Sequence, residues 1–124
     1  MNQIGQLTEL YGNIAACPIR NVLDRLGDKW TILVVLILHD VGKIRFNKLH
    51  NIMGDISQKM LTVTLRKLEA DGLVAREVFM EIPPKVEYQL TPIGESLVPH
   101  ISSLSHWALE NMTSILDARE KYST

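Results

Sequence analysis

The chain has 124 residues, 46% of them hydrophobic and 22% charged, and a formal net charge of −1. This length and composition are typical of one globular domain and exclude a disordered chain. The longest uninterrupted apolar run spans residues 32–38, far short of the roughly 20 residues that cross a bilayer, so no membrane partner is expected. The single cysteine, Cys17, excludes an internal disulfide framework, and residues 1–11 lack the pattern of a secretory signal, so we expect a cytoplasmic protein.

The charges are unevenly distributed along the chain. Residues 43–85 hold eight basic and five acidic side chains, a net charge of +3, whereas residues 1–42 carry −1 and residues 86–124 carry −3. A basic middle between acidic flanks is expected of a segment that contacts DNA. An excess of three charges also fits ordinary scatter, so the interpretation depends on the elements that carry these charges.

The first part of the chain predicts helices. Residues 1–16 are interpreted as a short polar helix or arm, followed by a helix that opens at Pro18, where a missing N–H costs nothing, and ends at Gly27. Asp28 is a plausible N-cap for the next helix, which contains the apolar run and ends at Gly42. The β-branched residues of that run also fit a buried strand, and we prefer a helix surrounded by neighbours.

Two short helices follow, joined by a tight turn at residues 54–55. The second begins at its N-cap, Ser57, and runs to about Ala70, with Gly72 as a stop signal just beyond. Apolar residues mark one face of the first helix: Phe46, Leu49, Ile52 and Met53. Two short helices with a glycine-containing turn between them indicate a helix-turn-helix, whose second helix reads DNA.

After Gly72 the apolar periodicity changes from that of a helix to that of a strand. Alternating side chains predict two strands, over residues 74–79 and 86–90. The tip between them, residues 81–85, contains paired prolines that cannot continue a ladder of hydrogen bonds. An antiparallel hairpin directly after a recognition helix is a wing.

The last helix is long enough to serve a second subunit. It begins with Thr91 as its cap and Pro92 at its first position, and runs to roughly Ala118 with a bend expected at Pro99. An apolar stripe and its neighbours form the predicted dimer interface: Leu97, Ile101, Leu104, Trp107, Ala108, Met112 and Ile115. The alternative is that this stripe packs only within its own domain. A crevice between this helix and the helix of Trp30 is a candidate site for a small-molecule effector.

The helix after Ser57 carries most of the candidate DNA contacts. At about 100° per residue, Leu61, Leu65 and Leu68 share its buried face, which leaves cations and groups that suit base edges on the opposite face. A solvated amphipathic helix has a similar pattern, and the wing that follows favours DNA. The predicted DNA-binding residues are Ser57, Gln58, Lys59, Thr62, Val63, Arg66 and Lys67 on this helix, Lys85 at the wing tip, and Asn47, Lys48 and Arg76 as backbone contacts.

Other classes of function are disfavoured. The sequence has no phosphate-binding loop, no GxGxxG, no HExxH and no nucleophile elbow, so we expect neither catalysis nor a cofactor. Its four histidines lack the spacing of metal ligands, so no metal site is expected. A winged helix used only for protein–protein contacts is the alternative, and its recognition face would be acidic or apolar.

Several segments resemble the HxlR-type regulators, which are small winged helix proteins related to the MarR class. The matching segments are Cys17-Pro18-Ile19 with residues 26–31, residues 56–62 with 65–74, and residues 83–88 with 90–94. Together they extend over residues 17–107. The resemblance implies a cytoplasmic, homodimeric transcriptional regulator that binds double-stranded DNA at a pseudo-palindromic operator.

The resemblance also makes Cys17 a candidate redox sensor. Some proteins of this family sense electrophiles or oxidants through a cysteine at this position. Cys17 lies at the start of a predicted helix, where the backbone dipole favours a thiolate. A small buried residue at the start of a helix is the alternative.

The predicted fold is α+β and mostly helical: a single winged helix-turn-helix DNA-binding domain over residues 1–124, with a two-stranded wing and a C-terminal dimerisation helix. Residues 1–16 are assigned to an N-terminal arm, residues 17–91 to the winged helix core, and residues 92–124 to the dimerisation helix and tail.

Overall fold

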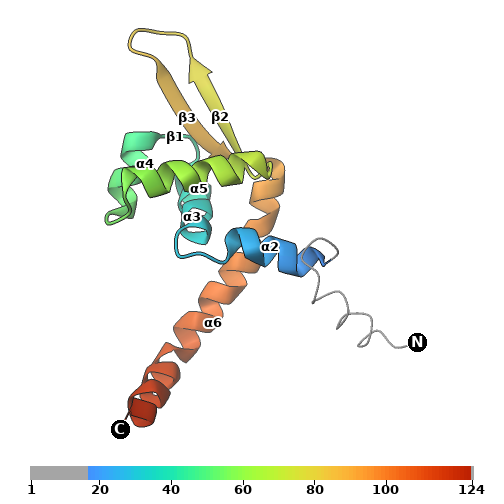
Figure 1. The fold of residues 1–124 in the computed structure, drawn as a ribbon, viewed down its shortest axis with the longest axis vertical. Coiled ribbons are helices and arrows are strands. Elements are labelled where there is room, and N and C mark those ends of the chain that lie inside the picture. The colour runs from blue at the N-terminus through green and yellow to red at the C-terminus, as the bar shows by residue number, and fades with distance from the viewer. Residues whose placement is uncertain (1–16, 124) are drawn as a thin grey trace, which may run out of the picture.

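The computed structural model describes residues 17–123, and the expected arm at residues 1–16 lies outside this part of the chain. The elements follow in the order α2 (Pro18–Leu26), α3 (Thr31–Val41), β1 (Ile44–Arg45), α4 (Phe46–Met53), α5 (Gln58–Ala70), β2 (Val74–Phe79), β3 (Lys85–Leu90) and α6 (Pro92–Ser123). Helices α3, α4 and α5 lie together, the β2–β3 hairpin projects from one end of them, and α6 runs away at the other end (Figure 1). The mostly helical α+β prediction is therefore confirmed.

The predicted helix ends are confirmed for the first two described helices. Pro18 is the first residue of α2, and the N–H of Gly27 donates to the Leu23 carbonyl at 2.8 Å. Gly42 ends α3 with a φ of 75°, a left-handed conformation that favours glycine. The apolar run at residues 32–38 is helical, which confirms the preference for a helix over a buried strand.

Asp28 caps α3 through its side chain, although the helix begins only at Thr31. Its carboxylate accepts hydrogen bonds from the N–H groups of Trp30 and Thr31 at 2.8 and 2.9 Å, and from the Thr31 hydroxyl at 2.6 Å. Lys67 Nζ donates to the same carboxylate at 3.0 Å. Partial burial alone would raise the pKa of Asp28, but these hydrogen bonds outweigh it and hold that pKa well below its usual range.

The core lies between α3, α4 and α5, and α6 closes it with Val98 and Ile101. Its largest fully buried side chains are leucines: Leu38, Leu49, Leu61, Leu65 and Leu68. Ile52, which the sequence places on the apolar face of α4 with Leu49, is 51% exposed. Ile52 lies about 60° beyond Leu49 around α4, past the edge of the buried face.

The wing belongs to a three-stranded antiparallel sheet with the strand order β1-β3-β2. The predicted hairpin pairs Val74 with Leu90 and Phe79 with Lys85. The two-residue strand β1 adds to β3 and was not predicted, because two residues are too few to show a periodicity. This short strand ties the wing to the segment that precedes α4.

The first turn of α6 is fixed to the turn between α5 and β2. The Thr91 N–H donates to the Leu73 carbonyl at 3.0 Å, and the Thr91 hydroxyl donates to the Gly72 carbonyl at 2.6 Å. Thr91 Oγ1 also accepts the Gly94 N–H at 3.2 Å, which confirms the predicted cap. A Cβ on Gly94 would lie 2.2 Å from the Leu73 carbonyl oxygen, so only glycine allows this close approach.

Helix α6 has 32 residues and continues to Ser123, beyond the predicted end at Ala118. Pro99, where a bend was expected, lies inside the helix. None of the described helices has an apolar stretch long enough to cross a membrane.

Candidate DNA interface

The N-terminus of α5 is built as the sequence predicts. The Met60 N–H donates to Ser57 Oγ at 3.0 Å, so Ser57 is a true cap. Before it, the turn from α4 passes through Gly54, whose φ of 84° favours glycine, and the side chain of Ile56 is buried. This anchoring fixes the direction in which α5 leaves the turn.

One face of α5 is buried and the other is open to solvent. Leu61, Leu65 and Leu68 are buried, as predicted. Thr64 is buried beside them, a position that sequence reasoning missed, and its hydroxyl donates to the Met60 carbonyl at 2.8 Å. The buried hydroxyl of Thr64 therefore has its hydrogen-bond partner within α5 and needs none from another element.

The outward face of α5 carries five of the predicted DNA-binding side chains. Gln58, Lys59, Val63 and Arg66 are exposed. Thr62 is half-buried, and its hydroxyl donates to the Gln58 carbonyl at 2.9 Å. An apolar side chain flanked by cations and hydrogen-bonding groups matches what base edges offer in a major groove.

Lys67 has an internal partner. Its Nζ lies 3.0 Å from Asp28 Oδ2, so this ion pair ties the last part of α5 to the turn before α3. The partners lie 39 residues apart in the sequence, and local periodicity could not reveal the pair. Asp28 takes one of the three N–H donors of this lysine, so a DNA phosphate would compete with Asp28 for its charge.

Lys85 does not lie at the tip of the wing, which corrects the expectation from sequence. It is the first residue of β3, its Nζ lies 4.6 Å from the centre of the Phe79 ring, and Glu87 Oε1 is 3.8 Å away. The tip itself, residues 80–84, has no Lys or Arg, and Met80 and Ile82 are fully exposed there.

A cleft of about 230 Å³ separates α5 from the base of the wing. Arg66 and Glu69 of α5 line one side, and Arg76 of β2 with Tyr88 of β3 line the other. Arg76 Nε lies 3.6 Å from Glu69 Oε1. Burial raises the pKa of Tyr88, so its hydroxyl keeps its proton and can donate a hydrogen bond.

The cleft gives two residues that sequence reasoning missed, Glu69 and Tyr88. Tyr88 follows the strand alternation that indicates a core face, so nothing in the pattern marked it as a contact. Two guanidinium groups and a hydroxyl donor around one hollow suit a phosphate, and the carboxylate of Glu69 competes with it.

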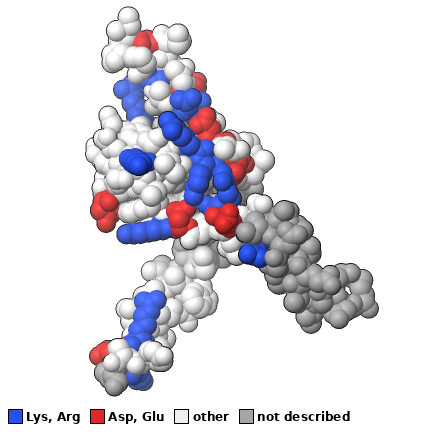
Figure 2. All heavy atoms as spheres, viewed as in Figure 1, with Lys and Arg blue, Asp and Glu red and all other residues white. Residues whose placement is uncertain are grey.

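Figure 2 shows Lys and Arg side chains in a band that runs from the base of the wing across α5, with acidic side chains along its edge. Asn47 and Lys48 are exposed on α4, the helix before α5. Both are open to solvent and available for contact with a DNA backbone.

The predicted dimer residues divide into two groups along α6. Leu97 is half-buried and Ile101 is buried in the core of its own chain, so Ile101 is not open to a second subunit. Farther along, Leu104, Trp107 and Met112 are 57%, 55% and 40% exposed. The remaining two, Ala108 and Ile115, are half-buried.

Cys17 and a hollow between α3 and α6, where the sequence predicts an effector crevice, both lie in the described part of the chain. Cys17 holds the N-cap position of α2 and is 2% exposed. The crevice is a hollow of about 270 Å³ between α3 and α6, next to which His39 Nδ1 and Glu95 Oε2 lie 2.7 Å apart. Within residues 17–123, no three His, Cys, Asp or Glu side chains are placed to hold a metal ion.

The sequence matches the family model described as HxlR-like helix-turn-helix over residues 25–115. A relative from Bacillus subtilis, the HTH-type transcriptional regulator YybR, is 44% identical over 102 residues, which cover 82% of this chain and 81% of the relative. The HTH-type transcriptional regulator YtfH from Escherichia coli is 36% identical over 124 residues, which cover 98% of both chains.

Two redox-related regulators are among the similar solved structures. The redox regulator HypR in its reduced form has a TM-score of 0.75 and 42% identity, covering 81% of this chain and 98% of that one. The reduced form of the transcriptional regulator YodB from Bacillus subtilis has a TM-score of 0.67 and 36% identity, covering 74% and 90%.

Proposed function

This chain belongs to the HxlR-like helix-turn-helix family and is a DNA-binding transcriptional regulator with a winged helix fold, and we propose that it acts as a homodimer on a pseudo-palindromic operator. The observation that carries the proposal is the outward face of α5, which is solvent-exposed, basic and continuous with the wing cleft. A module for protein contacts only would present an acidic or apolar face there. Proteins of this family are regulators, and we propose no catalytic activity.

We propose that the exposed side chains of α5 read base edges in the major groove. Arg66 would donate to guanine O6 and N7, and Gln58 would pair with adenine. Val63, 42% exposed, would contact a thymine methyl group. Lys59, Ser57 and the first N–H groups of the helix would hold a nearby phosphate.

The cleft beside α5 would hold a second phosphate. Arg76 and Tyr88 face it from the wing, and both can donate to a phosphate oxygen. DNA docking would then replace the pairing of Arg76 with Glu69. Lys85 stacks on Phe79 and would act on DNA at longer range, through its charge.

Dimerisation would use the part of α6 that its own domain leaves uncovered. Leu104, Trp107 and Met112 are large apolar side chains on this part. Two copies that bury this stripe about a two-fold axis would present two α5 helices to half-sites spaced by multiples of about 10 base pairs.

Capture of genomic fragments with the purified protein, followed by sequencing, tests the proposal. The expected result is a motif of two inverted half-sites. Sedimentation velocity of the protein with one captured duplex is expected to show two chains per duplex. Fragments without a shared motif, or one chain per duplex, would contradict it.

A redox response through Cys17 is a second candidate function. It is favoured by the position of Cys17 at the start of α2 and by similarity to redox regulators. With no second cysteine in the chain, oxidation by diamide would join two Cys17 thiols from two chains, with the two electrons and two protons passing to diamide. Because the thiol is 2% exposed, the reaction would need α2 to move.

A non-reducing gel after diamide treatment tests this second candidate. The expected product is a dimer band that dithiothreitol removes and that the Cys17→Ser variant lacks. Unchanged mobility together with unchanged operator affinity would count against a sensing role.

A further inference from the structure

The flank of α5 that lies away from the wing carries a second group of charged side chains. Consecutive residues of a helix point about 100° apart, so Arg66 borders the wing cleft while Lys67 lies on the other side of the outward face. There Lys67 meets Asp28, in the turn between α2 and α3. Figure 2 shows acidic and basic side chains side by side below the basic band, toward the position of α2 in Figure 1. The outward face of α5 therefore has charged side chains on both flanks.

Lys29, next to Asp28 in the chain, adds a second cation to this flank. Its side chain is exposed, and its Nζ lies 4.6 Å from the centre of the Trp30 ring. A cation held over one face of an aromatic ring keeps N–H donors on its other side for an anion. Lys67 also keeps donors, because Asp28 takes only one of its three. Two ammonium groups with open donors are therefore placed at one edge of the recognition helix.

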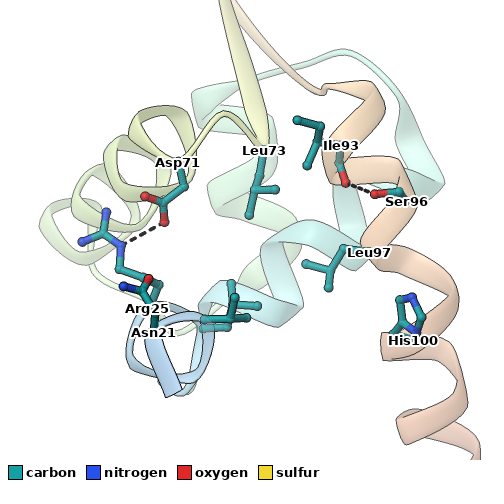
Figure 3. A pocket seen from close by; sticks show the side chains of 10 residues that line it. Asn21, Arg25, Asp71, Leu73, Ile93, Ser96, Leu97 and His100 are labelled. Carbon is teal, nitrogen blue, oxygen red and sulfur yellow. Dashed lines mark hydrogen bonds and ion pairs between the residues drawn. The ribbon is translucent and has the colours of Figure 1, made fainter. Parts of the chain in front are cut away.

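Two ion pairs fix this flank against the rest of the domain. Lys67 Nζ lies 3.0 Å from Asp28 Oδ2, and the Asp28 carboxylate is itself held by the N–H groups that it caps at the start of α3. Arg25 Nε of α2 lies 2.9 Å from Oδ2 of Asp71, the C-cap residue of α5 (Figure 3). The start of α3 and the end of α5 are therefore held together, which keeps both lysines beside the outward face.

The width of a major groove makes this flank suitable for a DNA backbone. An α-helix with its side chains is about 10–12 Å across, and the major groove of B-DNA is about 12 Å wide. A helix that reads base edges therefore has one sugar–phosphate strand on each side. The strand on the wing side would meet Arg76 and Tyr88. The second strand would pass the flank that carries Lys29 and Lys67.

We propose that Lys29 and Lys67 bind phosphates of this second strand, so that the operator is held on both sides of α5. Asp28 acts as an internal competitor, because it neutralises part of the charge of Lys67 and a phosphate must share that lysine with it. This inference rests on the proposed function, since it requires α5 to lie in the major groove. It extends the DNA-binding surface beyond the helix-turn-helix, to the start of α3.

Operator binding measured by fluorescence anisotropy at several salt concentrations tests the site. Lys29→Met and Lys67→Met keep an unbranched apolar stem and remove the charge. Each is expected to weaken binding by about three- to tenfold near 0.1 M salt, and to reduce the slope of log K against log salt by about 0.9, the value of one phosphate contact. Random duplexes should show the same losses, because phosphates carry no sequence information. Lys29→Arg and Lys67→Arg should keep the wild-type slope.

Lys43→Met is the matched control. Lys43 also lies beside a carboxylate, with its Nζ 2.9 Å from Glu77 Oε2. Glu77 follows Arg76 along β2, so its side chain lies on the face of the wing away from α5. Loss of this lysine should leave the slope unchanged. Unchanged slopes in both Lys29→Met and Lys67→Met, an equal loss of slope in the control, or a loss of slope in both arginine variants would overturn the site.

Ethylation interference gives the position of each contact, and it keeps the proposal testable if one lysine variant fails to fold. The wild type is expected to show interference at phosphates on both strands across one major groove. Lys29→Met and Lys67→Met should each lose interference on one strand, and Arg76→Gln should lose it on the other. Interference on a single strand in the wild type, or loss on the same strand in all three variants, would overturn the inference.

The role of Asp28 is tested with Asp28→Asn, which keeps an oxygen acceptor for the cap. It should tighten binding by up to about fivefold, and this gain should be absent when Lys67→Met is present in the same chain. A gain that persists without Lys67 would overturn the competition. Unchanged slopes in a protein that binds its operator contradict only this inference, whereas a wild type without sequence-specific binding contradicts the proposed function.

Discussion

At the scale of single residues, Arg66 is the side chain on which sequence preference is expected to depend most. It is exposed on the outward face of α5 and also borders the wing cleft. Arg66→Ala should weaken operator binding by about 1–3 kcal/mol and reduce the discrimination at one base pair, because a bidentate contact to guanine is lost. Fluorescence anisotropy with operators substituted one base pair at a time measures both effects. Equal losses on all duplexes, operator and random alike, would identify Arg66 as a phosphate contact only.

Glu69 is expected to oppose DNA binding. Its carboxylate lies 3.6 Å from Arg76 Nε, in the cleft where a phosphate is proposed to bind. Glu69→Gln should tighten binding by up to about fivefold, since exposed pairs of this kind are worth roughly 0.2–1 kcal/mol. The gain should disappear when Arg76→Gln is present in the same chain. A gain that persists in the double variant would show that Glu69 acts through general repulsion and not through Arg76.

At the scale of elements, the start of α3 depends on Asp28. Asp28→Ala removes three hydrogen bonds within the cap and the ion pair to Lys67, and should lower the free energy of unfolding by about 0.5–2 kcal/mol. Because the folded pKa lies below the usual value of about 3.9, this contribution is present above pH 4 or so and is lost as the pH falls toward the folded pKa. Urea unfolding of both proteins between about pH 3 and 7 should show the difference shrinking on the acid side. A difference that stays constant over this range would contradict the account.

The exposed part of α6 is expected to hold the dimer together. Leu104→Glu should weaken dimer affinity by about tenfold or more, because it places an unpaired carboxylate in an apolar contact. Thr113→Glu is the control, since Thr113 is exposed and lies about 180° from Leu104 around the helix. Sedimentation velocity over a range of concentrations compares the two. Dissociation caused by the control alone would place the interface on another face of α6.

Most element boundaries could be predicted from the sequence, because the residues that begin and end helices act through their own backbone and side chains. Pro18, Gly42 and Ser57 act on the backbone within one turn, and their effect does not depend on the rest of the chain. The misses have non-local causes. Strand β1 exists only because β3 passes beside it, and the exposure of Ile52 depends on where the neighbours of α4 end.

The candidate site was predictable to a similar degree. Helical periodicity alone separates the buried leucines of α5 from the exposed Lys59 and Arg66. It could not show that Lys67 pairs with Asp28, or that Glu69 and Tyr88 share a cleft, because these groups meet only after the wing and α3 are in place.

At the scale of the whole molecule, the surface proposed for DNA binding and the surface proposed for dimerisation lie on different parts of the fold. The unit of α3, α4, α5 and the wing carries the proposed DNA-binding face, and α6, with its proposed dimer stripe, runs away from it (Figure 1). The turn between α5 and β2 touches both, through the bonds of Thr91 and the ion pair of Asp71.

Helix α5 is proposed to read DNA in the major groove, with one copy of the helix in each half of the operator. Hydroxyl-radical footprinting of a captured operator, combined with methylation interference at guanine N7, tests it most directly. Two protected segments are expected on one face of the duplex, spaced by a multiple of about 10 base pairs, with interference at a guanine in each half-site that is lost in Arg66→Ala. A single protected segment, or interference that Arg66→Ala leaves unchanged, would contradict it.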